Sequence, residues 1–323
     1  MNLNLIAVPI IHILKHQHLF EGIEAHILVN DKHIKLNYAD ESFQESLEKL
    51  AAKGVVHIYI AKTDFYNMMG QLQSRMANNR FYDPLTTDEL RASTCNTVYE
   101  LSKTYINRLG ATAEVLEMMK DANQKMQKIL DQSPGIFAFV KRFKANCSEE
   151  YLKISVTNLF LTMTLSKFPW KSQLIVQKSM MASLLCDITM NSKSFDALYH
   201  YQTQGGELDD DVARHPILAS EILNRKRDLI PSETITIIEQ HHERPDGKGF
   251  PDGITAMRFN QLSAVFIVCQ RFVDLLFKNE FDHNRHHDMI NELKPVYQGG
   301  HFDKAMDALI IVVEEAQWGE VTS

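Results

Sequence analysis

From residue 136 to residue 323 the sequence reads as helix almost throughout, and no stretch there alternates apolar and polar residues as a half-buried strand does. The β-type segments are confined to residues 1–65, where they are NLNLIAVPI, EAHILVN, HIKLNY and VVHIYIA. Between the last two lies ESFQESLEKLAAKG, whose apolar residues recur at helical spacing and whose Gly54 suits a C-cap. Because 323 residues are enough for two domains, we predict an α+β chain with a small α/β N-terminal domain and an all-α C-terminal domain.

Two amphipathic helices are expected between these parts, over residues 86–110 and 111–135. Thr87 is in a position to cap the start of the first helix, and Gly110 ends it. The second helix carries an apolar stripe of Val115, Met119, Ala122, Met126 and Ile129. Plain helix packing explains this stripe best, and a dimer seam is the second interpretation. The predicted division is a sensor or regulatory domain (1–80), a helical connector (81–135) and a helical domain (136–323).

Charge and composition exclude several classes of function. The net charge of −7 gives no reason to expect binding to nucleic acid or to an anionic membrane. The four cysteines have no CxxC spacing, which suits a reducing cytosol rather than a disulfide framework. The sequence has no run of 18 apolar residues, which argues against a membrane span. Its short apolar start has no basic segment before it, which argues against a cleaved signal peptide. We therefore expect a cytoplasmic protein.

Four side chains in the helical half suit a divalent metal: Asp187, His215, His241 and His242. His215 precedes a proline at an expected helix start, where proline is tolerated. His241 and His242 end a helix, and adjacent helical residues diverge by about 100°, so both can face one site only near that end. Neutral imidazoles with a carboxylate suit iron, manganese or zinc.

The segment HHERPDGKGFPDG at 241–253 closely resembles the HHExxDGxGYP signature of the HD-GYP family, bacterial phosphodiesterases that linearise cyclic di-GMP. Other pieces follow in the family's order and approximate spacing: YLKISV (151–156), ASLLCDITM (182–190), HPILASEIL (215–223) and GGHFDKAMDAL (299–309). The resemblance spans about residues 136–323. It implies an all-α HD-GYP-like domain with cyclic di-GMP as a candidate ligand.

The departures from the family pattern fall on one side of the expected two-metal site. By motif position, Ile154 replaces an upstream histidine, Cys186 replaces the histidine of HD, and Gln270 replaces a late aspartate. The set implied for the second metal, Asp187 with the three histidines, is complete. The resemblance therefore implies one ion at most, or none, with Asp187 as the remaining catalytic candidate.

Ligand positions have also changed relative to the family. Met190 stands where the family has a phosphate-facing lysine, and Phe250 replaces the signature tyrosine and lacks its hydroxyl. The segment KNEFDHNR (278–285) lacks the family's arginines at their expected places. Arg244, Asp246 and Lys248, together with Phe250, are the candidate substrate-binding residues, and Lys193 is a further cation that can compensate. Solvated surface charges and loop bracing, in particular by Asp246, explain the same residues without a ligand.

Two functions remain open at this point. The first is a catalytically impaired regulatory module that binds a partner protein or cyclic di-GMP. The second is an active metal-dependent phosphodiesterase that yields pGpG or GMP. Two rival metal motifs are weaker: FDHNRHHDM, with His283 and His287 four residues apart, reads as a solvated segment, and the aspartates of DDDVARHP read as partners of a helix N-terminus.

Overall fold

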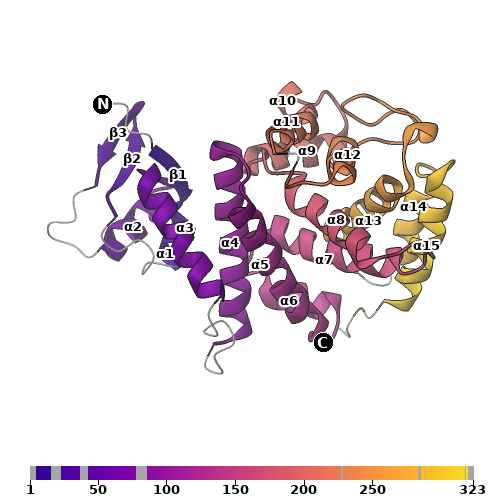
Figure 1. The fold of residues 1–323 in the computed structure, drawn as a ribbon, viewed down its shortest axis with the longest axis horizontal. Helices are drawn as coiled ribbons and strands as arrows, with labels where there is room; N and C mark the ends of the chain where they lie inside the picture. The colour runs from indigo at the N-terminus through magenta and orange to yellow at the C-terminus, as the bar shows by residue number, and fades with distance from the viewer. Residues whose placement is uncertain are drawn as a thin grey trace. The chain divides into compact units, whose positions relative to one another are not determined.

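The computed structural model describes residues 5–15, 23–36, 43–77, 86–226, 228–282, 285–316 and 318. The chain divides into two compact units, Met1–Thr87 and Asp88–Ser323 (Figure 1). The helices of the predicted connector thus belong to the same unit as the helical domain that follows them.

The first unit holds a four-stranded antiparallel sheet in the order β1-β4-β2-β3. Its strands are β1 (Leu5–Pro9), β2 (Ala25–Val29), β3 (Lys32–Lys35) and β4 (His57–Ala61). Its helices are α1 (Ile10–Lys15), α2 (Phe43–Ala52) and α3 (Lys62–Ala77). The predicted strand NLNLIAVPI ends one residue earlier than expected, because Ile10 already begins a helix, and its first three residues lie outside the described part of the chain.

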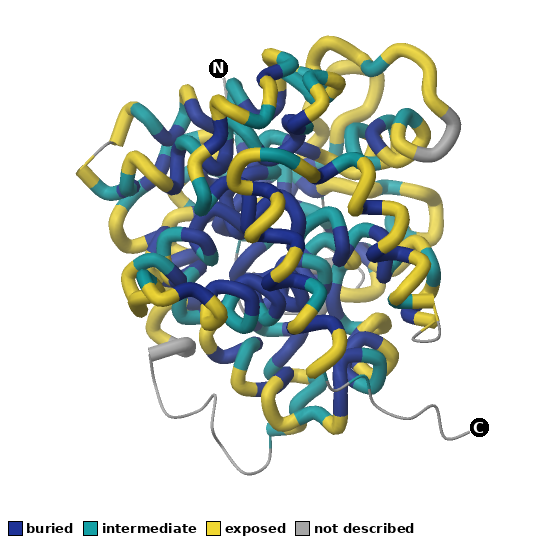
Figure 2. The backbone as a smooth tube through the Cα atoms, turned by 90° about the vertical axis from the view of Figure 1, so that its right-hand side faces the viewer, coloured by how far each residue is buried: buried dark blue, intermediate teal, exposed yellow. Residues whose placement is uncertain are grey.

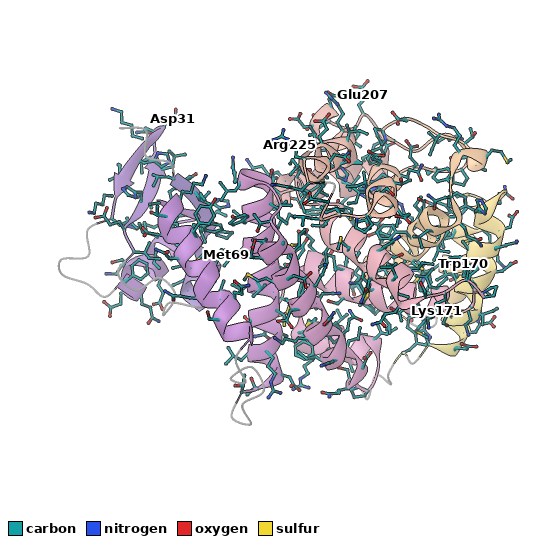
Figure 3. All side chains as sticks on the ribbon, viewed as in Figure 1. Asp31, Met69, Trp170, Lys171, Glu207 and Arg225 are labelled. Atoms are coloured by element: carbon teal, nitrogen blue, oxygen red, sulfur yellow. The ribbon has the colours of Figure 1, made fainter. Side chains whose placement is uncertain are left out.

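The central strand β4 buries alternate residues, as a strand with one face on the core does. Ile58 and Ile60 of β4 are fully buried, whereas their neighbour Tyr59 is only partly covered. The β2–β3 hairpin turns at Asn30 and Asp31, both with positive φ, at the position labelled Asp31 in Figure 3. Asn and Asp tolerate this conformation best among residues with a side chain, so the turn follows from the local sequence.

The second unit is helical. Its helices are α4 (Asp88–Leu109), α5 (Ala113–Asp131), α6 (Ile136–Phe143), α7 (Glu149–Leu165), α8 (Gln173–Leu185), α9 (Ser192–Gln204), α10 (Asp210–Ala213), α11 (His215–Asn224), α12 (Ser232–Gln240), α13 (Gln261–Lys278), α14 (His286–Leu293) and α15 (His301–Glu315). A 3-10 helix, η3 (Ala256–Arg258), follows the signature loop. Among the described residues of this unit there is no strand, only one bridge pair between Asp246 and Thr255. The absence of alternating patterns after residue 136 thus predicted the class of this unit correctly.

The core of the helical unit is built around α13, which packs against α7, α12, α14 and α15. Phe160 of α7 and Phe272 of α13 are both fully buried and meet edge to face at 5.1 Å between ring centroids. Figure 2 shows the buried segments gathered inside this unit, with the exposed turns outside them. The residues of the candidate site come from the ends of α8, α11 and α12 and from the sides of α7 and α13.

The apolar stripe of α5 is part of this core. All five of its residues are at most 6% exposed, and α5 contacts α4 and α7. Helix packing within the chain therefore accounts for the stripe, and this face offers no open surface for a dimer seam. None of the described helices combines the length and the apolarity that crossing a bilayer requires.

Candidate metal centre

Three helix ends bring four potential metal ligands together. Asp187 follows the end of α8, His215 begins α11, and His241 and His242 follow the last residue of α12. One ligand atom from each residue lies within 4.8 Å of those of the other three. Among the described residues, no other group of three or more His, Cys, Asp or Glu side chains meets in this way.

The distances within the cluster are short. Nε2 of His215 lies 3.1 Å from Oδ1 of Asp187, and Nε2 of His241 lies 3.6 Å from the same oxygen. The two Nε2 atoms are 3.1 Å apart. The three histidines are at most 3% exposed. The cluster is therefore both compact and shielded from bulk water.

Backbone carbonyls orient two of the imidazoles. Nδ1 of His215 lies 2.6 Å from the Val212 carbonyl oxygen, and Nδ1 of His241 lies 2.6 Å from that of Ile238. Each Nδ1 donates its proton there, so in the neutral ring the Nε2 lone pair points into the cluster. Two lone pairs at this separation beside a carboxylate oxygen need a cation among them. This donor set fits one divalent ion, and a carbonyl acceptor on the far nitrogen is the usual support for a metal-binding histidine.

Burial and neighbouring groups shift the pKa values of the cluster. Burial by itself raises the pKa of Asp187, but the imidazoles of His215 and His241 outweigh it and hold that pKa well below its usual value. Burial lowers the pKa of His241, and it lowers the pKa of His242 further. The neutral imidazole and the ionised carboxylate, which are the forms that bind metal, are therefore favoured.

His242 has different surroundings from the other two histidines. The ring of Phe250 stacks on it with 4.6 Å between ring centroids. Nη2 of Arg271 lies 2.8 Å from its Nδ1. Its Nε2 is buried and has no hydrogen-bond partner among the described residues. Arg271 was not singled out in the sequence, because its contact depends on α13 passing beside the end of α12.

The three substituted family positions lie in the wall of one pocket with Asp187, and this pocket has a volume of about 1090 Å³. Ile154 is buried and apolar, and Gln270 offers only a neutral amide. Cys186 is 2% exposed, and burial together with the neighbouring Asp187 holds the pKa of its thiol well above the usual value. A neutral thiol is a poor metal ligand. This wall therefore supplies no obvious set of ligands for a second ion.

The predicted ligand-binding residues separate into two groups. Arg244, Lys248 and Phe250 line the pocket. Asp246 instead braces the loop: it pairs with Arg244 at 2.6 Å and accepts the backbone N–H of Lys248 at 3.1 Å. Neither Met190 nor Lys193 lines the pocket. Met190 lies in a small apolar cluster with Leu198 and Val212, against which Phe250 packs.

The signature loop is held from within by Glu243, whose role sequence reasoning missed. Its Oε1 accepts the backbone N–H groups of Asp252 (2.6 Å) and Gly253 (3.1 Å), and its Oε2 accepts that of Ile254 (3.1 Å). At Gly249 a Cβ atom would lie 2.2 Å from the backbone nitrogen of Arg244. The glutamate and this glycine are therefore required by the loop's shape, and the HHE pattern is the sequence signal from which the glutamate's role could have been found.

Glu150 lines the pocket and belongs to a second polar cluster, with Tyr99 and Lys103, that the sequence did not reveal. The ammonium of Lys103 donates to both oxygens of Glu150, at 2.6 and 2.8 Å, and the Tyr99 hydroxyl donates to the same carboxyl at 2.5 Å. Burial raises the pKa of Glu150 to about 7, despite the opposing effect of Lys103. These residues come from α4 and α7, so no local pattern joins them.

The rival motifs do not form metal clusters in the described part of the chain. His287 is exposed on α14, and the position of His283 lies outside the described residues. Asp210 and Asp211 occupy the first turn of α10, as expected for partners of a helix N-terminus.

Comparison with known proteins gives one informative likeness. No family model matches the chain, and no curated protein matches it. Among solved structures the chain is similar to Bd1817, an HDG"Y"P protein from Bdellovibrio bacteriovorus, with a TM-score of 0.57 and 16% sequence identity over 96% of this chain and 99% of that one. At this identity the likeness is one of fold, and it agrees with the motif resemblance: the chain has an HD-GYP-like fold.

Proposed function

We propose that this protein is a divergent HD-GYP-type signalling module that holds one divalent metal ion at most and binds cyclic di-GMP with little or no turnover. One observation carries the proposal. Asp187 and His242, two members of the compact cluster of candidate metal ligands, line one pocket together with Ile154, Cys186 and Gln270, which the motif resemblance places at the positions of the other metal's ligands.

The low turnover follows from the chemistry of phosphodiester cleavage. Two ions about 3.5–4 Å apart stabilise both the attacking and the leaving oxygen, whereas one ion polarises a phosphoryl oxygen on one side only. Losing half of that stabilisation costs several kcal/mol, and each 1.4 kcal/mol slows the reaction about tenfold. The residues at the three substituted positions, Ile154, Cys186 and Gln270, are neutral, so they do not replace the lost charge.

An anionic ligand is supported by cations along the pocket. Lys153, Arg244, Lys248 and Arg271 all line it. Arginine and lysine form charge-assisted hydrogen bonds with phosphate oxygens, and Phe250 offers a ring face beside them. Binding would then let the module report ligand occupancy to a protein partner. The cytoplasmic location and the oligomeric state stay predictions.

The alternative function is an active cyclic di-GMP phosphodiesterase. The complete set of four ligands and the intact signature loop favour it. Iron, manganese and zinc all suit these ligands. The phosphodiesterase requires metal at this cluster and the regulatory module can also hold one ion there, so turnover rather than metal content separates the two functions.

The test begins with elemental analysis of protein purified without chelator and without a nickel column. We expect about one iron, manganese or zinc ion per chain, lost in His215→Ala and kept in His287→Ala, an exposed histidine outside the cluster. Cyclic di-GMP binding is then measured by calorimetry, and hydrolysis by chromatography of the products. Hydrolysis abolished by His241→Ala would establish the enzyme. Absence of both metal and nucleotide binding would contradict the proposal and leave a protein-interaction role.

A further inference from the structure

We infer that His242 is not a metal ligand: Arg271 fixes it as the tautomer that carries its proton on Nε2, so that Asp187, His215 and His241 alone hold the ion. This inference rests on the proposed metal centre and narrows its ligand set. It gives His242 a different task, which is to present an N–H group beside the ion.

The donor and acceptor chemistry of the two side chains carries the inference. A guanidinium has five N–H donors and no acceptor. The 2.8 Å contact between Nη2 of Arg271 and Nδ1 of His242 therefore requires Nδ1 to accept. A neutral imidazole that accepts at one nitrogen carries its proton on the other. Nε2 of His242 then has no lone pair to offer a metal.

Arg271 is held where this contact forms. Its Nη1 donates to Oδ2 of Asp274 at 3.3 Å, and Tyr297 interacts with it electrostatically. Its side chain is only 14% exposed. The stacked ring of Phe250 restrains His242 from the other side. For Nε2 of His242 to bind metal, the Arg271 contact must break, or the ring must turn against both restraints.

The neighbouring histidine shows the opposite arrangement. Nδ1 of His241 faces the Ile238 carbonyl, as Nδ1 of His215 faces that of Val212, so both present lone pairs from Nε2. Two residues adjacent in the sequence thus take opposite tautomers. What remains is a set of two histidines and one carboxylate, an arrangement that leaves coordination positions open.

The Nε2–H group of His242 is placed to donate a hydrogen bond to an oxygen atom of a ligand in the pocket. Its Nε2 has no hydrogen-bond partner among the described residues, and His242 lines the pocket with Arg244 and Lys248. A buried donor without a partner is costly, so a bound oxygen acceptor would satisfy it. The chemical class that fits is an anionic phosphate oxygen, held between this N–H and the nearby cations.

The tautomer is tested directly by long-range ¹H–¹⁵N NMR of histidine-labelled, metal-free protein. We expect the Nε2–H form for His242 and the Nδ1–H form for His215 and His241, assigned with single His→Gln variants. Arg271→Met removes the donor at similar length, and the His242 signals should then move away from the Nε2–H pattern. An Nδ1–H tautomer for His242 in the unmodified protein would overturn the inference.

The ligand set is tested with zinc. X-ray absorption of zinc-loaded protein should show outer-shell scattering from two imidazoles, and Arg271→Met should show three if the freed ring joins the ion. His242→Gln should lower zinc affinity by no more than about tenfold, the lower end for residues that only support a ligand set. His215→Gln should instead leave no stoichiometric zinc.

The two proposals fail in distinguishable ways. Three imidazoles in the unmodified protein, or zinc loss in His242→Gln equal to that in His215→Gln, would refute the role given to His242 and leave the metal centre intact. Failure of the unmodified protein to bind zinc, iron or manganese would refute the metal centre, while the NMR measurement would still decide whether Arg271 fixes the tautomer.

Discussion

Nε2 of His215 lies 3.1 Å from Nε2 of His241, and both atoms carry lone pairs because each Nδ1 donates to a backbone carbonyl. Such a pair needs a metal ion or a proton between its two nitrogens. The carbonyls that set this geometry belong to the residues three positions earlier in the chain, Val212 and Ile238, so the local helix ends build it.

A divalent ion should therefore stabilise the folded protein. At a free metal concentration of 100 times Kd, the free energy of unfolding should rise by about 2.7 kcal/mol. Urea unfolding with manganese or zinc, compared with chelator-treated protein, measures this rise. His215→Ala should abolish it and His287→Ala should not. An equal rise in His215→Ala would show that the ion binds elsewhere.

Restoring the lost ligands should add a second ion. The triple variant Ile154→His, Cys186→His and Gln270→Asp places two imidazoles and a carboxylate in the wall of the pocket that also holds Asp187. We expect metal content to rise from about one to about two ions per chain, and phosphodiester hydrolysis to increase with it. Elemental analysis checks the first result. The triple variant could fold, as its circular dichroism would show, and still bind only one ion. That result would mean that the three new ligands lie too far from Asp187, or that Arg271 leaves no room for a second ion.

Gly249→Ala should disrupt the signature loop. Its Cβ would meet the backbone nitrogen of Arg244 at 2.2 Å and backbone atoms of Glu243 at 2.5 Å, and backbone cannot move aside cheaply. We expect a loss of about 2–3 kcal/mol in the free energy of unfolding, measured with urea, with weakened metal binding.

The matched control is Gly70→Ala in α3, where the added atom meets nothing within 4 Å. Alanine is a better helix former than glycine, so this change should stabilise its own unit by roughly 0.5–1 kcal/mol. Unchanged stability and metal affinity in Gly249→Ala would show that the loop adapts, contrary to the geometry.

Glu150 should give the protein a pH-dependent stability. Burial raises its pKa to about 7 in the folded state, above the value near 4.5 for an exposed glutamate. The folded state therefore holds the proton more tightly between these values. The stabilisation is fully present below pH 4.5 and is lost as pH rises to about 7, at up to about 1.4 kcal/mol per pH unit.

Glu150→Gln removes this titration. Urea unfolding at pH 5, 6, 7 and 8 should show the unmodified protein losing stability relative to the variant as pH rises, with little further change above pH 7. A constant difference across this range would mean that Lys103 keeps the Glu150 carboxylate ionised throughout.

The sequence was most informative where a property is local. The apolar stripe of α5 and the helix start at His215 each follow from residues within a few positions of one another. The boundary at Ile10 was wrong because apolar β-type composition continues into the first turn of α1. The four candidate ligands were also identified from the sequence, through motif order and spacing.

The sequence by itself determined the class of each unit and identified the candidate metal ligands, because periodicity and helix-end chemistry depend on neighbouring residues. Only the tertiary structure decided what lies between distant helices. It placed Arg271 of α13 against His242, and it buried Glu150 of α7 beside Lys103 of α4. The physical reason is that hydrogen-bond direction and desolvation depend on which helices pack together, and these contacts join residues 29 and 47 positions apart.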